Sequence, residues 1–139
     1  MTSSVLMLAG AAICWASRKQ TTVALSTAES EFMSLTATGA EVMHKRRLLS
    51  EMGFPQESPT PVLEDNQAAI AMATNPGSHH KRTKHIDVRY RKICEWVREG
   101  AVLVKYVTTK LQVADLLTKA LAFPVFDSLR GIILGRSNH

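Results

Sequence analysis

The sequence predicts an α/β fold, in which helices pack on a mixed β-sheet, within a single domain. Two short apolar stretches near the start are typical of paired strands, and the later segments alternate between helical periodicity and single short strands. The chain has 139 residues, of which 45% are hydrophobic, so it is long enough and apolar enough to bury one core. It contains no internal repeat or low-complexity segment.

The first two elements are predicted strands. Residues 3–8 and 11–17 are short apolar runs, and Gly10 lies between them, where a hairpin turn would form. Continuous apolar runs are also compatible with a helix, so the hairpin is the favoured of two interpretations.

The longest predicted element is a helix that begins near Ser26. Ser26 and Glu29 have the spacing of a capping box, in which side chains satisfy backbone N–H groups at the helix start. Apolar residues then recur at helical spacing until Gly53 and Pro55 end the pattern. The residues with this spacing are Ala28, Phe32, Leu35, Val42, Met43 and Leu49.

A short strand and a second helix follow. Val62 and Leu63 belong to the strand, which ends at Glu64 and Asp65 directly before an alanine-rich helix over residues 67–73. The residues that stop this helix are Asn75, Pro76 and Gly77.

Further elements are predicted in the second half of the chain. A polar, basic loop over residues 78–84 leads into a third helix that ends at Gly100, residues 101–107 form a strand, and residues 111–121 form another helix. A tail over residues 123–134 is expected to dock on the domain. The apolar face of the third helix consists of Ile86, Tyr90, Ile93 and Val97. That of the next helix consists of Val113, Leu116, Leu117 and Ala120, and the docking residues of the tail are Phe126, Leu129 and Ile133.

Charge and cysteine content limit the classes of partner and compartment. Lys and Arg number 17 against 12 Asp and Glu, and the formal charge of +5 favours a polyanionic partner, although an ordinary soluble basic protein has the same balance. Cys14 and Cys94 lie far apart without a second pair at metal-binding spacing, so we expect reduced thiols in an intracellular protein. The apolar run over residues 5–13 is too short to span a bilayer and follows no basic residue, so nothing indicates secretion or a membrane.

Asp65 is the first candidate for chemistry. It lies where an apolar strand ends and a helix begins, the position at which open α/β sheets present functional groups to ligands. The alternative is that Asp65 only caps the helix, since Asp satisfies free N–H groups at a helix start, and Asn66 could cap equally well. Sequence position alone leaves both interpretations open.

Glu31 and Asp115 are the other two candidate carboxylates. At about 100° per residue, Glu31 falls near the edge of the apolar face of the long helix, whereas Glu29 lies farther round and has the capping role. Asp115 lies in the first turn of its predicted helix, where a carboxylate also complements the helix dipole. Ordinary surface acids would explain both positions, but three carboxylates from separate elements could also converge on divalent metal ions that activate water.

A basic stretch lies between the second and third predicted helices. Over residues 78–92 only Asp87 offsets the positive side chains, so phosphate binding is the natural hypothesis and a solvated helix face is the alternative. The basic residues are Lys81, Arg82, Lys84, Arg89, Arg91 and Lys92. The nearby His79, His80 and His85 have neither a matching cysteine pair nor an HExxH pattern, so a zinc site is not expected.

Four longer segments occur in a fixed order along the chain. They are LSTAESEF over residues 25–32, EDNQAAI over 64–70, TKHIDVRY over 83–90 and KYVTTKLQVADLLTKAL over 105–121. This order resembles the ribonuclease H domain of copia-type retrotransposon Pol polyproteins, and WASRKQ from Trp15 fits the same pattern. The similarity runs from about Ser3 to the last of these segments.

The resemblance implies a fold and a reaction. The family has a five-stranded mixed sheet flanked by helices, and four carboxylates that bind two Mg²⁺ ions, with Mn²⁺ as the alternative, to hydrolyse the RNA strand of an RNA/DNA hybrid. Three of the four have counterparts here as catalytic residues and metal ligands: Glu31, Asp65 and Asp115. By this resemblance Asp65 holds a metal ion near the attacking water, and Glu31 and Asp115 complete the cage.

The resemblance also implies a nucleic-acid surface and partners. The expected nucleic-acid-binding residues are Lys81, Arg82, Lys84, His85 and Arg89, with His85 and Asp87 supporting the fold or the hybrid-facing surface rather than catalysis. The expected partners are the RNA/DNA hybrid and the reverse transcriptase domain of the same polyprotein. The expected location is the cytoplasm, in a virus-like particle, or the nucleus.

One departure from the family pattern affects the expected activity. The family's first catalytic aspartate lies on a central first strand that should precede Thr2, and no such segment is present. We therefore expect a single ribonuclease H-like domain over residues 1–139 that is incomplete at its N-terminus, with a C-terminal tail over residues 122–139. Loss of a metal ligand and of a central strand predicts weak stability and impaired endonuclease activity. The alternatives are a catalytically dead nucleic-acid-binding remnant and a non-functional transposon fragment.

Overall fold

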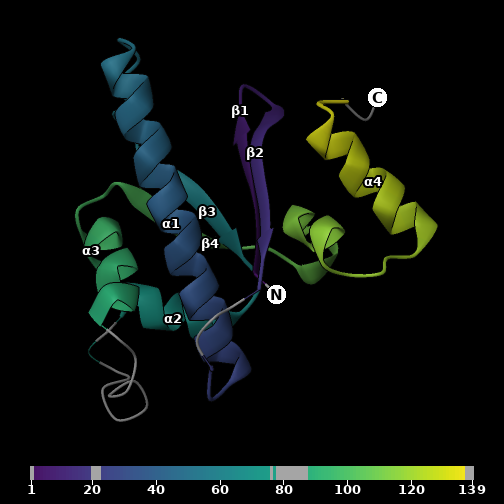
Figure 1. Ribbon diagram of the computed structural model, residues 1–139, viewed down its shortest axis with the longest axis horizontal. Coiled ribbons are helices and arrows are strands. Elements are labelled where there is room, and N and C mark those ends of the chain that lie inside the picture. Colours follow the sequence, from purple (N-terminus) through teal and green to yellow (C-terminus); the bar gives the residue numbers. More distant parts are fainter. Residues whose placement is uncertain (1, 20–22, 76, 78–87, 137–139) are drawn as a thin grey trace. The chain divides into compact units, whose positions relative to one another are not determined.

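The computed structural model describes residues 2–19, 23–75, 77 and 88–136, and it divides into two compact units. One unit is Ala24–Tyr106, and the other combines Met1–Val23 with Val107–His139. Helices and short strands alternate along the chain (Figure 1), so the predicted α/β class is confirmed. That the two units together make one domain stays a prediction. In the part of the chain that is described, no helix is both long and apolar enough to span a bilayer.

The unit Ala24–Tyr106 is built around a parallel pair of strands. Its elements in chain order are α1 (Thr27–Glu51), β3 (Thr60–Glu64), α2 (Gln67–Thr74), the 3₁₀ helix η2 (Val88–Arg91), α3 (Lys92–Arg98) and β4 (Val102–Tyr106). β3 and β4 pair in parallel, with Val62 opposite Val104. Parallel strands need a crossover connection, and here it includes α2 and α3.

The predicted capping box starts α1. The Ser26 hydroxyl accepts a hydrogen bond from the Glu29 backbone N–H at 3.2 Å. The Glu29 carboxylate accepts in return from the backbone N–H of Leu25 at 2.9 Å, one residue before the cap. Both ends of the box therefore satisfy N–H groups that no helical carbonyl can reach, and the capping role of Glu29 is confirmed.

The helices α1, α2 and α3 cover one face of the β3–β4 pair (Figure 1). Val62 and Val104 are buried on this face, whereas Leu63 and Leu103 on the other face are 48% and 44% exposed. α1 and α3 approach closely at Gly39, where an added Cβ would lie 2.7 Å from Ile93 Cδ1. Ile93 itself is fully buried, so α3 is anchored to α1 at this contact.

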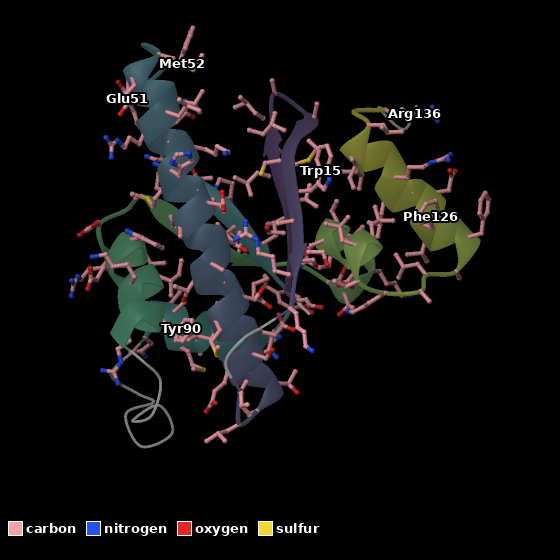
Figure 2. All side chains as sticks on the ribbon, in the orientation of Figure 1. Trp15, Glu51, Met52, Tyr90, Phe126 and Arg136 are labelled. Carbon is pink, nitrogen blue, oxygen red and sulfur yellow. The ribbon has the colours of Figure 1, made fainter. Side chains whose placement is uncertain are left out.

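The third predicted helix begins later than its apolar pattern suggested. A 3₁₀ turn over Val88–Arg91 precedes α3, which starts at Lys92, and Ile86 lies outside the described residues. The backbone carbonyl of Tyr90 accepts a 2.8 Å hydrogen bond from the Thr36 hydroxyl of α1. Tyr90 accordingly lies beside α1 (Figure 2), and this tertiary bond fixes the turn that leads into α3.

The other unit begins with the predicted hairpin. β1 (Thr2–Leu8) and β2 (Ala11–Arg18) pair antiparallel, with Val5 opposite Trp15. The two turn residues, Ala9 and Gly10, have φ of 51° and 81°. Two left-handed residues match the twist of the strands in a two-residue hairpin turn, so the prediction of a turn at Gly10 is confirmed.

The predicted helix over residues 111–121 is wrong. The segment forms two short 3₁₀ helices instead, η3 (Thr109–Leu111) and η4 (Val113–Leu117). In an α-helix the Thr118 N–H would bond the Ala114 carbonyl, which here accepts from the Ser3 hydroxyl at 2.9 Å. The Thr118 N–H bonds the Asp115 carbonyl at 3.1 Å, which gives the tighter 3₁₀ turn.

The predicted C-terminal tail forms a helix, α4 (Phe123–Ile133), which packs against η4 and β2. Leu129 is 1% exposed, so its predicted docking role is confirmed. Phe126, labelled on α4 in Figure 2, has 38% of its surface exposed, and Ile133 is half-buried, so Leu129 is the main anchor.

The strands lie in two sheets, where the sequence predicted one mixed sheet. Among the described residues, strand pairing joins β1 only to β2 and β3 only to β4. Each pair has a local cause, a tight turn for the hairpin and a helical crossover for the parallel pair. Both strand orientations are therefore present, in separate two-stranded sheets.

Candidate functional site

Asp65 lies at the junction between β3 and α2, as predicted. The helix cap is its neighbour: the Asn66 side-chain oxygen accepts from the Ala69 N–H at 3.0 Å. The interpretation of Asp65 as the cap is therefore wrong. Its side chain is half-buried, and among the described residues no hydrogen bond or ion pair to its carboxylate is found.

Glu64 is a second acidic residue at this junction, and the sequence analysis did not single it out. It is 6% exposed, and its Oε1 accepts from the Asn66 backbone N–H at 2.9 Å. The alternation of side chains along β3 places Glu64 on the same buried face as Val62. That period-two pattern is the signal by which Glu64 could have been found.

The surroundings of Glu64 are unusually unfavourable for negative charge. Burial raises the pKa of Glu64 to about 7. The hydrogen bond from the Asn66 N–H acts in the opposite direction, and the charges of Glu31 and Asp65 raise this pKa further. Glu31 and Asp65 are therefore near enough for their charges to act on the buried Glu64 carboxyl group.

Glu31 comes to this cluster from α1. It is half-buried and directly precedes Phe32, which is 3% exposed, so it lies at the rim of the buried face as predicted. Glu31 and Asp65, two of the predicted site residues, thus both act on the charge of Glu64.

Asp115 has a different setting in the other unit. It lies in the first turn of η4, as predicted for its helix, and is 8% exposed. Its carboxylate forms an ion pair with Lys119, with a distance of 2.8 Å between Oδ2 and Nζ. Because Asp115 belongs to the other compact unit, its convergence with Glu31 and Asp65 stays a prediction.

The chemistry of the cluster fits a hard divalent cation in part. Carboxylate oxygens are the ligands that Mg²⁺ and Mn²⁺ prefer, and Glu31 and Asp65 supply them from two elements. Within the described ranges, no group of three or more His, Cys, Asp or Glu residues is arranged to hold a metal ion. The described residues therefore do not form a metal site, and metal binding by Glu31 and Asp65 stays a prediction.

The predicted nucleic-acid surface lies largely outside the described residues. Lys81, Arg82, Lys84 and His85 fall in the range 78–87, which the structure does not describe. The backbone of Arg89 belongs to η2, but its side chain is not described. Phosphate binding by these residues stays a prediction.

Comparison with known proteins places this chain beside transposon polyproteins. It is 38% identical over 137 residues to a retrovirus-related Pol polyprotein from transposon TNT 1-94 of Nicotiana tabacum, a match that covers 99% of this chain. Two such polyproteins from Arabidopsis thaliana, of transposons RE2 and RE1, are 38% and 37% identical over 87% and 84% of this chain. No family model and no solved structure matches.

The matched region is a small part of each relative. The chain spans 10% of the tobacco polyprotein and 8% of each Arabidopsis polyprotein. The matches nevertheless extend over most or nearly all of this chain. The homologues of this chain are therefore retrovirus-related Pol polyproteins from copia-type transposons.

Proposed function

We propose that this chain is the ribonuclease H-like domain of a retrotransposon Pol polyprotein, and that this domain hydrolyses the RNA strand of RNA/DNA hybrids. The observation that carries the proposal is the position of Asp65 directly after β3 and before α2, where the charges of Asp65 and Glu31 both act on the buried Glu64. Carboxylates gathered at the end of a strand, at the start of a helix, are suited to bind metal ions that act on phosphodiesters.

The strand pairs support the ribonuclease H-like fold. The resemblance in sequence implies a central strand that pairs with the first hairpin strand on one side and with the strand that carries Asp65 on the other. β1 and β2 pair antiparallel, and β3 and β4 pair in parallel. Antiparallel and parallel pairs are both components of a mixed sheet, which supports the proposal.

The residues of this chain would have separate tasks in the reaction. Bound Mg²⁺ ions, or Mn²⁺ in their place, would supply an activated water and stabilise charge on the reacting phosphate. Glu31 and Asp65 would hold the ions through carboxylate oxygens, and Asp115 would join them after exchanging its bond to Lys119. The basic residues Lys81 and Arg82 would bind hybrid phosphates.

The test is cleavage of a labelled RNA/DNA hybrid in the presence of Mg²⁺. The chain is compared with a version extended by a preceding strand that carries an aspartate, since the resemblance implies a fourth carboxylate there. Cleavage by both versions, or by the extended version alone, is the expected result. Absence of cleavage by both, while both are folded by circular dichroism, would overturn the proposed activity.

A binding assay separates a nuclease from a nucleic-acid-binding remnant. Lys81→Ala and Arg82→Ala should each weaken hybrid binding on all sequences and make it less dependent on salt. Salt-sensitive hybrid binding without Mg²⁺-dependent cleavage would identify the chain as a nucleic-acid-binding remnant. Absence of both binding and cleavage would identify it as a non-functional fragment. The reverse transcriptase domain of the same polyprotein is the expected protein partner.

A further inference from the structure

The bond between Glu64 and Asn66 spans Asp65. The Glu64 carboxylate, which belongs to the residue before Asp65, accepts at 2.9 Å from the N–H of the residue after it. Glu64 is 6% exposed, so solvent competes little for this bond. A bond of this kind closes a small loop around Asp65 and restricts the backbone on both of its sides.

The two residues beside Asp65 are each held in place by a secondary-structure element. Glu64 is the last residue of β3 and stands opposite Tyr106 in the parallel pair. Asn66 is the cap of α2, where its carbonyl accepts from the Ile70 N–H at 3.1 Å and its side chain accepts from the Ala69 N–H. The Glu64 bond therefore ties the end of the sheet to the start of the helix across the one residue between them.

We infer that Glu64 is a positioning residue for Asp65, which it holds at the strand–helix junction by accepting the Asn66 N–H. This inference rests on the proposed function only for what Asp65 binds, since the positioning itself follows from the hydrogen bonds. Groups behind a metal ligand that fix its orientation commonly change metal affinity by about 10-fold to 100-fold when removed.

A positioning role and a ligand role make different demands on the Glu64 side chain. A metal ligand at this position must be a carboxylate, whereas the bond to Asn66 needs only an acceptor oxygen. Glutamine keeps an acceptor of the same reach and has no charge, and leucine fills similar space without any acceptor. The pair Glu64→Gln and Glu64→Leu therefore distinguishes the two roles.

The experiment uses the full chain with Mn²⁺ as the probe. Mn²⁺ binding is measured by electron paramagnetic resonance, amide hydrogen exchange is followed at Asn66, and the free energy of unfolding is measured for every variant. Val62→Ala is the matched control, because Val62 is buried on the same face of β3 and makes no side-chain bond to the junction. It reports the effect of lost stability alone.

The expected result is that Glu64→Leu lowers Mn²⁺ affinity by about 10-fold and speeds exchange at Asn66. Glu64→Gln should keep both within about twofold, and Val62→Ala should keep Mn²⁺ affinity at comparable loss of stability. Equal loss of affinity in Glu64→Gln and Glu64→Leu would make Glu64 a ligand and overturn the inference. Unchanged exchange at Asn66 in Glu64→Leu would overturn it as well.

The exchange measurement needs no metal ion, so it separates this inference from the proposed function. One informative result is that Mn²⁺ fails to bind the wild-type chain while Glu64→Leu still speeds amide exchange at Asn66. That result would contradict the proposed metal-dependent activity and would support the positioning of Asp65 by Glu64.

Discussion

Asp65 and Asp115 were predicted as equivalent members of one site, yet they have opposite surroundings. Asp65 follows the end of β3, where the neighbouring carboxyl groups belong to Glu31 and Glu64. Asp115 is buried in η4, where Lys119 lies 2.8 Å from its carboxylate. Asp65 therefore lies beside another acidic residue, whereas Asp115 is paired with a lysine.

The difference shows that burial does not by itself identify a ligand-binding acid. A buried acid paired with a lysine has its charge satisfied, whereas a half-buried acid beside two others gains by binding a cation. Asp115 would have to give up its lysine before it could bind a cation, whereas no hydrogen bond or ion pair to the Asp65 carboxylate is found among the described residues.

The largest expected effect comes from Asp65→Asn. If Asp65 holds a metal ion, this change should lower Mg²⁺-dependent cleavage by at least about 100-fold, because the amide has lost the charge that binds the metal. The free energy of unfolding should change by less than about 0.5 kcal/mol, since no described group is bonded to this carboxylate. Steady-state cleavage and urea denaturation give the two values.

Two variants serve as controls for Asp65→Asn. Glu57→Gln removes an exposed carboxylate from the loop before β3 and should leave cleavage unchanged. Asn66→Ala removes the cap of α2 and should lower stability by about 1 kcal/mol. Full cleavage by Asp65→Asn would remove this residue from the proposed mechanism.

The pH dependence of stability tests the crowding of charge at Glu64. The folded pKa of about 7 lies above the ordinary value of 4.5, so between these values the folded chain holds a proton that the unfolded chain has lost. The stability contributed by this group is complete below about pH 4.5 and is lost as the pH rises through 7. The loss should be on the order of 3 kcal/mol.

Glu64→Gln isolates this effect because glutamine does not titrate. Without divalent ions, the free energy of unfolding of the wild type minus that of Glu64→Gln should fall between about pH 4 and pH 8. Denaturation at a series of pH values measures the difference. A difference that stays constant or rises over this window would contradict the environment described for Glu64.

The smallest expected effect concerns the partner of Asp115. Lys119→Ala should lower the free energy of unfolding by about 1 kcal/mol, because it leaves a buried carboxylate without the lysine bonded to it. Lys92→Ala is the matched control, since Lys92 and Glu95 form an ion pair whose side chains are 54% and 43% exposed. That change should cost less than about 0.5 kcal/mol. Equal costs would mean that the burial of Asp115 has no energetic consequence.

The elements that could be predicted are those with local causes. The hairpin turn at Gly10 and the capping box at Ser26 each depend on residues within a few positions, and both are confirmed. The segment over residues 111–121 has a helical apolar pattern but forms two short 3₁₀ helices, and its Ala114 carbonyl accepts from the distant Ser3 hydroxyl. Apolar periodicity carries no information about a bond to a residue more than a hundred positions away.

The site could be predicted in part. Asp65 and Glu31 were selected from their places at a strand end and on the rim of a helix, and both act on the charge of the buried Glu64. Glu64 was not predicted because charged residues at strand ends are usually exposed to solvent. The alternation of side chains along β3 nevertheless places it on the same buried face as Val62.

The sequence by itself determined where chain segments turn, start and stop, and it identified the acids that stand at those boundaries. Only the tertiary structure decided which of these acids share a charged neighbourhood and which have a lysine, because the pKa of a carboxyl group depends on burial and on charges brought in from other elements. Hydrogen bonds at turns and helix caps depend on residues that are adjacent in sequence. The electrostatic potential at a carboxyl group depends on charges from all parts of the folded chain.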